Sequence, residues 1–184
     1  AGDVTINTSS LLVRDGALIS ARTQSSGNGG SLTIKASDSV QLSGADSGLL
    51  VNATAGSTAG NLTVETRQMS VSNGAQVTVS SPEGQAGNIT VQANSLLLNQ
   101  GRFFAETAKT GEDGANIRMF GLDLLRLDNE SLISANALDQ ANGGNVTIDS
   151  TFVVAIPPNG SRGSDITANA KKGNGGAVNI TTQG

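Results

Sequence analysis

The sequence predicts an all-β protein, a right-handed parallel β-helix (solenoid) of about six coils with roughly 29 residues and three short strands per coil. Three observations predict this fold: a cassette recurs at a nearly constant period, apolar residues alternate within it, and helical periodicity is scarce. The cassette is a small turn residue, a polar residue, an apolar residue, a residue that is usually Thr, and a second apolar residue. Its seven copies begin near residues 2, 30, 60, 87, 115, 144 and 176. The first apolar residues stand at 4, 32, 62, 89, 117, 146 and 178, so the steps are 28, 30, 27, 28, 29 and 32 residues.

The first strand of each coil is expected at the cassette itself. In the second copy, Leu32 and Ile34 lie on one face of the strand and Thr33 on the other. Stacked coils turn each position into a column, and the expected inward column is Val4, Leu32, Leu62, Ile89, Ile117, Val146 and Val178. The polar position of the cassette is expected to form a ladder of stacked side chains at the turn, through Asp3, Ser31, Asn61, Asn88, Asn116, Asn145 and Ala177.

The second strand is expected about five residues after the first. Its inward pairs are Leu11 and Val13, Val40 and Leu42, Met69 and Val71, Leu96 and Leu98, and Leu125 and Leu127. The sixth copy, residues 152–156, is apolar throughout, so the sequence leaves its inward face open. Turn residues such as Asn73 and Gly74 follow this strand, because Asn and Gly tolerate a positive φ.

The third strand is expected to begin near Leu18, Leu50, Val77, Phe103, Leu132 and Ile166. Its second inward residue is usually small and often Ala, which predicts a wall that curves inward. The register stays open by one residue in the second and fourth copies. A variable Gly-rich loop then returns to the next cassette. Helix has little support, since the one segment with near-helical spacing, residues 119–127, also fits the paired strands of its repeat.

The composition excludes several classes of function. The chain has no Cys and no His, so it has no disulfide or thiolate and lacks the commonest general base and transition-metal ligand. It carries a net charge of −4 with 2% aromatic residues and no basic run, which argues against nucleic-acid partners. No apolar stretch approaches the ~20 residues of a membrane-spanning helix.

Catalytic and metal-binding patterns are not found in the sequence. A carbohydrate-active β-helix needs acids that converge from adjacent coils, but Asp123 and Asp128 belong to one coil and have no acidic counterparts in the next. We therefore predict no enzyme activity, no catalytic or metal-ligating residues and no cofactor. Adventitious Ca²⁺ binding is the alternative for Glu112, Asp113 and Asp139.

The longest irregular insertion, residues 156–163, is the first candidate for contact with a partner. Its two prolines cannot take part in a strand ladder, and loops that project from a solenoid often carry recognition. The candidate contact residues are Pro157, Pro158, Asn159 and Arg162.

The repeat as a whole resembles the repeats of filamentous-haemagglutinin-like exoproteins, which the two-partner secretion pathway exports. The shared pattern is Gly-Gly-Asn-apolar-Thr-Ile, then Leu-x-Leu with Asn-Gly-Ala, then Ile-Ser-Ala. Residues 163–170, followed by 173–176, are especially similar to the versions common in cyanobacteria. The resemblance covers the whole chain, so residues 1–184 are expected to be a single β-helix segment excised from a longer exoprotein. The Asn-Pro-Asn motifs of the family's amino-terminal secretion domain are missing from it.

The resemblance implies a non-enzymatic shaft of a secreted or bacterial cell-surface, outer-membrane-associated adhesin, with a role in adhesion, aggregation or biofilm. It implies a cell-surface glycan or protein receptor, and a cognate outer-membrane transporter engaged through the missing amino-terminal domain. Because the array is uncapped, end-to-end self-association is also expected. The alternative is a carbohydrate-binding or carbohydrate-active β-helix of the polysaccharide lyase or hydrolase kind. An ice- or mineral-binding face is disfavoured, because each cassette has one Thr and the Thr column is interrupted at Arg118 and Asn179.

Overall fold

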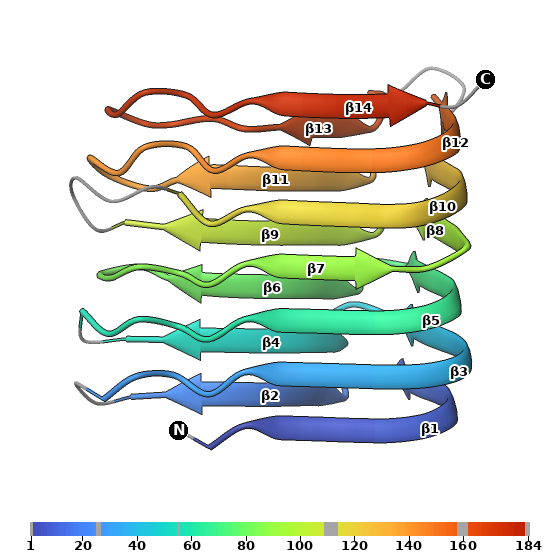
Figure 1. The fold of residues 1–184 in the computed structure, drawn as a ribbon, viewed down its shortest axis with the longest axis horizontal. Coiled ribbons are helices and arrows are strands. Elements are labelled where there is room, and N and C mark those ends of the chain that lie inside the picture. The colour runs from blue at the N-terminus through green and yellow to red at the C-terminus, as the bar shows by residue number, and fades with distance from the viewer. Residues whose placement is uncertain (1, 25–26, 55, 109–113, 158–161, 183–184) are drawn as a thin grey trace.

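The predicted solenoid is confirmed by a computed structural model of the 184-residue chain, which describes all residues except 1, 25–26, 55, 109–113, 158–161 and 183–184. The chain rises from its N-terminus to its C-terminus as a right-handed coil of about six turns (Figure 1). The described residues form fourteen strands and no helix, so no helix there could span a membrane. The longest dimension lies in the plane of a coil, so these coils alone are broader than the stack is tall (Figure 1).

All pairings between strands are parallel, and they build two sheets from successive coils. The larger sheet contains β1 (Val4–Arg14), β3 (Leu32–Ser43), β5 (Leu62–Ser72), β7 (Ile89–Gln92), β8 (Ser95–Asn99), β10 (Ile117–Asp128), β12 (Val146–Ile156) and β14 (Val178–Thr182). The smaller sheet contains β2 (Leu18–Thr23), β4 (Gly48–Ala53), β6 (Gln76–Ser81), β9 (Arg102–Thr107), β11 (Leu132–Ala137) and β13 (Asp165–Thr167). We number the coils one to seven, starting from β1, β3, β5, β7, β10, β12 and β14.

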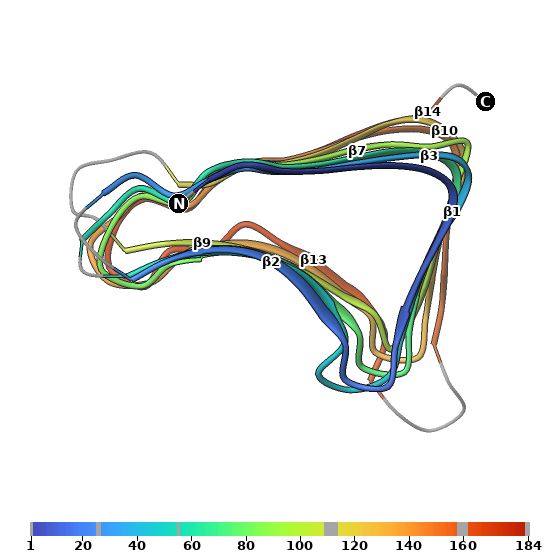
Figure 2. The ribbon, with the colours of Figure 1, turned by 90° about the horizontal axis from the view of Figure 1, so that it is seen from below.

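The three predicted segments of each coil form three walls around a roughly triangular interior (Figure 2). In most coils the first two segments are one continuous strand that bends at a corner, and only in coil four are they separate, as β7 and β8. The ladder shifts register at this corner, for example between Thr8 and Ser10. Such a shift lets a strand bend sharply without leaving the sheet. The small sheet forms the third wall, which curves inward as predicted (Figure 2).

The predicted inward column of the first wall is confirmed. Its seven members pair in register from Val4 to Val178, and the five between them are fully buried. Each therefore packs against the same position in the coils above and below, and burial of an aliphatic side chain contributes roughly 1.5–3 kcal/mol. The stack thus carries its core as continuous ladders.

The structure resolves the positions that the sequence left open. In copy two the third wall turns Leu49 and Val51 inward, and in copy four it turns Phe103 and Ala105 inward. In the second wall of coil six, Val153 pairs with inward-facing Leu125. Its neighbours Phe152, Val154 and Ile156 are exposed on the outside.

The polar position of the cassette forms the predicted ladder, mainly through bonds from side chain to backbone. The Asn88 Oδ1 atom accepts the backbone N–H of Asn116 at 2.8 Å and its side-chain amide at 3.1 Å. Asn116 Oδ1 accepts the backbone N–H of Asn145 at 2.8 Å, and the series continues from Asp3 to Ala177. Each step satisfies a backbone donor at a turn and ties one coil to the next.

A column of left-handed residues marks the turn after the second wall. Asp15, Asn73, Gln100 and Asn129 all have φ between 52° and 58°, and the equivalent Gly44 has φ of 100°. Asn and Gly adopt this conformation more readily than other residues. The predicted turns are therefore confirmed where the sequence placed them.

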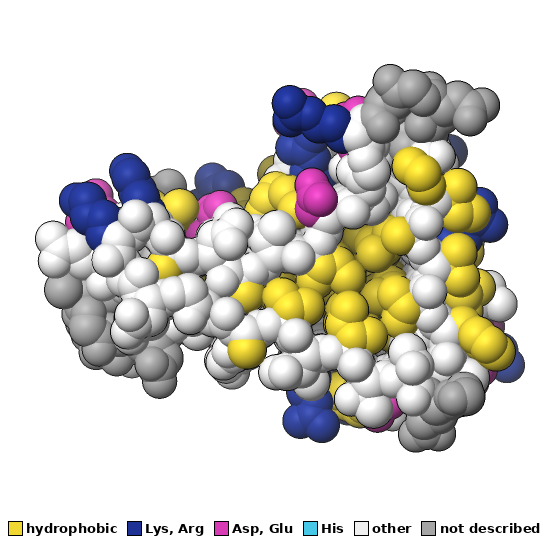
Figure 3. Space-filling view, turned by 90° about the horizontal axis from the view of Figure 1, so that it is seen from above, with side chains coloured by type: hydrophobic (Ala, Val, Ile, Leu, Met, Phe, Trp, Pro, Cys, Tyr) yellow, Lys and Arg dark blue, Asp and Glu magenta, His cyan; other side chains and the backbone are white. Residues whose placement is uncertain are grey.

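Figure 3 shows apolar side chains in a hollow on the face of the described stack at its C-terminal end. Inward-facing Val178 is 41% exposed and Ile180 is 44% exposed, although the same positions are fully buried two coils below. In the described residues the strands of coils two to five are paired on both sides, and β12 is paired on its upper side from Val146 to Ser150.

Candidate functional site

A groove of about 660 Å³ lies on the outer surface, at the corner between the first and second walls. We call it the corner groove. It crosses coils two to five, and its lining residues are Asp38, Ser39, Gln41, Arg67, Gln68, Asn94, Ser95, Asp123 and Leu124. Strands far apart in the sequence thus build one surface.

Extra residues in two coils build the sides of this groove. Between the paired positions on either side of the corner, coil two has Ser37 and Asp38, where coil three has Arg67 alone. Coil five likewise has one residue more at the corner than coils four and six. A strand with an extra residue bulges, and both Asp38 and Asp123 are exposed there. Coils three and four lack the extra residue, so they form a recess between two ridges.

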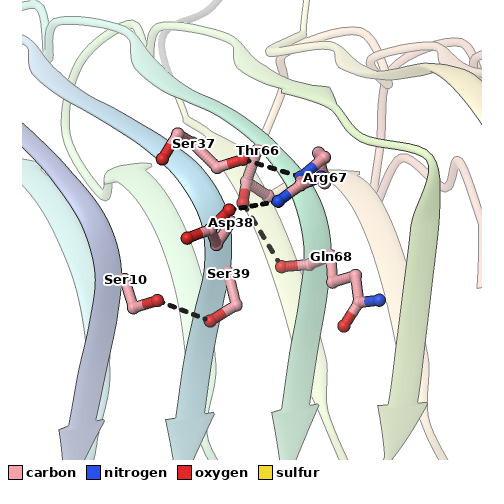
Figure 4. Close-up of polar contacts among 7 residues, drawn as sticks. All are labelled: Ser10, Ser37, Asp38, Ser39, Thr66, Arg67 and Gln68. Atoms are coloured by element: carbon pink, nitrogen blue, oxygen red, sulfur yellow. Dashed lines mark hydrogen bonds and ion pairs between the residues drawn. The ribbon is translucent and has the colours of Figure 1, made fainter.

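The first ridge is joined to the floor by polar contacts (Figure 4). The Arg67 guanidinium forms an ion pair with Asp38, and its Nε atom donates a hydrogen bond to the Ser37 carbonyl oxygen at 3.0 Å. The Ser39 Oγ atom donates to Ser10 Oγ at 3.3 Å. Since the Arg67 side chain is 69% exposed, its ion pair adds only about 0–1 kcal/mol to stability. This ion pair nevertheless engages Arg67, which is the one cationic residue among those that line the groove.

The second ridge is anchored through the backbone. The carbonyl oxygen of Asn94 accepts the N–H of Asp123 at 2.7 Å and that of Leu124 at 3.3 Å. The side chains of Gln41, Gln68 and Asn94 make no hydrogen bond within the part of the chain that the structure describes, so they remain available to a ligand. With two carboxylates and one guanidinium, the lining carries a net charge of −1.

The groove continues along the outside of the second wall. A second hollow of about 370 Å³ shares Ser39, Gln41, Gln68 and Ser95 with the corner groove and extends to Ser70 and Leu97. These positions alternate with the buried residues of β3, β5 and β8, so the strand pattern itself turns them outward. The combined surface is mostly amide and hydroxyl, with small apolar areas.

The residues of the predicted contact loop lie elsewhere. Pro157 follows β12 directly and Arg162 precedes β13, and both are exposed. Pro158 and Asn159 lie outside the described residues. The loop connects the second and third walls, whereas the corner groove lies between the first and second. The structure therefore does not bring Pro157 or Arg162 into the groove.

The other acidic residues considered in the sequence do not line the corner groove where the structure describes them. Asp128 pairs with Arg126 at 2.7 Å, and Asp139 pairs with Lys172 at 3.1 Å. Glu112 and Asp113 lie outside the described residues. Within the described part of the chain, no group of three His, Cys, Asp or Glu side chains is placed to hold a metal ion.

Sequence reasoning did not find the corner groove, although the sequence contains a signal for it. The second apolar residue of the cassette and the first inward residue of the second wall are Ile34 and Val40 in coil two, and Met119 and Leu125 in coil five. Each of these pairs is six positions apart, whereas the corresponding pairs of the other coils, such as Val64 and Met69, are five apart. The longer spacing marks the two ridges.

Comparison of the chain with protein-family models, curated proteins and solved structures gave no match. The functional inference therefore depends on the residues and geometry of this chain.

Proposed function

We propose that this chain is a non-enzymatic structural and adhesive shaft segment of a secreted or cell-surface adhesin of the filamentous-haemagglutinin-like kind. The observation that carries the proposal is the unbroken stacking of equivalent positions, with a side-chain bond at every step of the polar ladder. Such a stack adds length by adding coils, and each coil adds further outer surface. This is the architecture that mechanical reach combined with repeated weak contacts requires.

The proposed location is the bacterial cell surface, after export through a two-partner outer-membrane transporter. The support for this location is the resemblance of the repeats. A cell-surface glycan or protein is the proposed receptor, and the isolated 184-residue segment is proposed to self-associate end to end.

A carbohydrate-active enzyme is the weaker candidate, because the groove acids are far apart. Asp38 and Asp123 stand on coils two and five, three coil steps apart, or about 14 Å at the usual strand spacing. The paired carboxylates of glycosidases lie roughly 5–9.5 Å apart. Carbohydrate binding without catalysis has the corner groove in its favour.

Two measurements test the proposal. Pulled by its ends in single-molecule force spectroscopy, the chain should resist tension and lengthen in steps of whole coils, each about 100 Å of extended chain for ~29 residues. Incubated with polygalacturonate or alginate and Ca²⁺, it should release no shortened products. Extension without resistance would refute the shaft, and turnover that disappears in Asp123→Asn would establish the enzyme instead.

A further inference from the structure

We propose that the corner groove binds a neutral oligosaccharide chain, laid in the recess between the two ridges and along the outside of the second wall. The inference rests on the proposed adhesive function and identifies the ligand class and the site of contact. Three features of the groove support it: its size, its hydrogen-bonding groups and its charge.

The size of the groove fits an extended ligand. A volume of about 660 Å³ falls within the usual 300–1,000 Å³ of small-molecule sites. The hollow along the second wall lengthens the surface further. A short chain of sugars can therefore lie between the ridges, whereas a single ion would touch only a small part of the lining.

The hydrogen-bonding groups of the groove match sugar hydroxyls. Gln41, Gln68 and Asn94 each present an amide donor and an acceptor, and Ser95 adds a hydroxyl. Sugar hydroxyls are likewise both donors and acceptors. Leu124 gives the lining a small apolar area for the C–H face of a sugar ring. The lining contains no aromatic residue, so each groove should bind weakly and contribute through multivalency.

The charge of the groove selects a neutral ligand. The Arg67 guanidinium is already paired with Asp38, and the described residues offer the carboxylate of Asp123 no ion-pair partner. A uronate, sulfate or phosphate group placed here would face that carboxylate and a lining of net charge −1. A neutral sugar can instead donate its hydroxyls to Asp123.

The backbone beneath the groove disfavours an extended peptide. Peptides commonly bind a sheet by pairing with a free strand edge. Here β5 pairs with β3 and β8, and β8 pairs with β5 and β10, so both edges of the floor strands are occupied. A ligand must bind through side chains, as glycans do.

The test is titration of the isotope-labelled 184-residue chain with neutral hexasaccharides (cellohexaose, maltohexaose and mannohexaose) and with hexagalacturonate, followed by NMR. At least one neutral chain should shift the signals of Gln68, Asn94 and Ser95 with a Kd in the millimolar range, and hexagalacturonate should not. The double variant Gln68→Ala/Asn94→Ala should weaken binding at least tenfold. Its matched control, Gln24→Ala/Gln140→Ala, removes two exposed amides outside the groove and should bind like the original chain.

Three outcomes would overturn the proposal: no neutral hexasaccharide binds the folded chain, the groove variant binds as well as the control, or hexagalacturonate or a neutral Gly-Ser peptide binds the groove more tightly. An unchanged NMR spectrum away from the substitutions confirms that the variants fold. The titration is independent of the force and turnover measurements that test the proposed shaft. A failure of the glycan site can therefore be distinguished from a failure of the shaft.

Discussion

Replacement of one inward residue tests whether the core is a set of continuous ladders. Leu62 belongs to coil three, is fully buried, and pairs with Leu32 below and Ile89 above. Leu62→Ala removes its side chain between two neighbours that are themselves fully buried, so the cavity has little room to collapse. Buried Leu→Ala changes cost about 2–5 kcal/mol, and we expect ~3–4 kcal/mol here.

The adjacent residue provides the matched control. Thr63 lies on the same strand with its side chain on the outer face, and it is only half-buried. Thr63→Ala should therefore cost less than about 1 kcal/mol, mainly through strand propensity. Urea-induced unfolding followed by far-UV circular dichroism measures both variants against the original chain.

The difference in unfolding free energy between Leu62→Ala and Thr63→Ala tests which face of the strand points inward. A loss of ~3 kcal/mol is a large part of the 5–15 kcal/mol that stabilises a typical domain. Leu62→Asp places an unpaired carboxylate at the same point and should melt several coils together. If Leu62→Ala and Thr63→Ala were equally stable within ~0.5 kcal/mol, the assignment of the inward face would be wrong.

Three further predictions concern the polar ladder, the raised pKa of Glu106 and self-association through coil seven. Asn88→Ala removes the acceptor for two hydrogen bonds from Asn116. It should lower the free energy of unfolding, measured by urea titration, by about 1 kcal/mol. An unchanged urea midpoint would mean that water fully replaces the two bonds. Burial raises the pKa of Glu106 above its ordinary value of 4.5, so stability should fall as pH rises from that value through the raised pKa. Glu106→Gln should flatten this slope in pH-dependent melts, and an equal slope in both chains would contradict the assignment. Light scattering should show that the mean molecular mass increases with protein concentration, because the segments stack end to end. Ile180→Lys, on the exposed face of coil seven, should suppress this increase. Association that persists in the variant would mean that the contact lies elsewhere.

The fold was predictable because the chain repeats its own pattern. Wherever apolar and polar residues alternate, as in Leu32-Thr33-Ile34, the inward face could be read from the sequence, and pairing with Leu62 and Val64 confirms it. Where neighbouring residues are all apolar, the sequence could not show which of them face inward. Leu49, Leu50 and Val51 give no alternation, and the inward pair there depends on register with the coils on either side.

The candidate site was harder to predict than the fold. A catalytic site would require acids in neighbouring coils, whereas the groove depends on the number of backbone residues at one corner. Residues such as Gln68 and Asn94 are ordinary surface amides in the sequence, and only the ridges on either side give them a shared role. The extra position before Val40 and Leu125 was visible, but its effect follows from three-dimensional stacking.

The corner between the first and second walls lets the outer surface differ between coils while the core stays the same. Coils two and five gain a residue there, yet the inward columns on both sides of the corner stay in register with their neighbours. Insertion or deletion of a single residue at this point therefore raises or removes a ridge while the inward columns on both sides keep their register. A long array of such coils could carry a series of differently shaped grooves, each set by the length of one corner, on a shaft whose interior never changes.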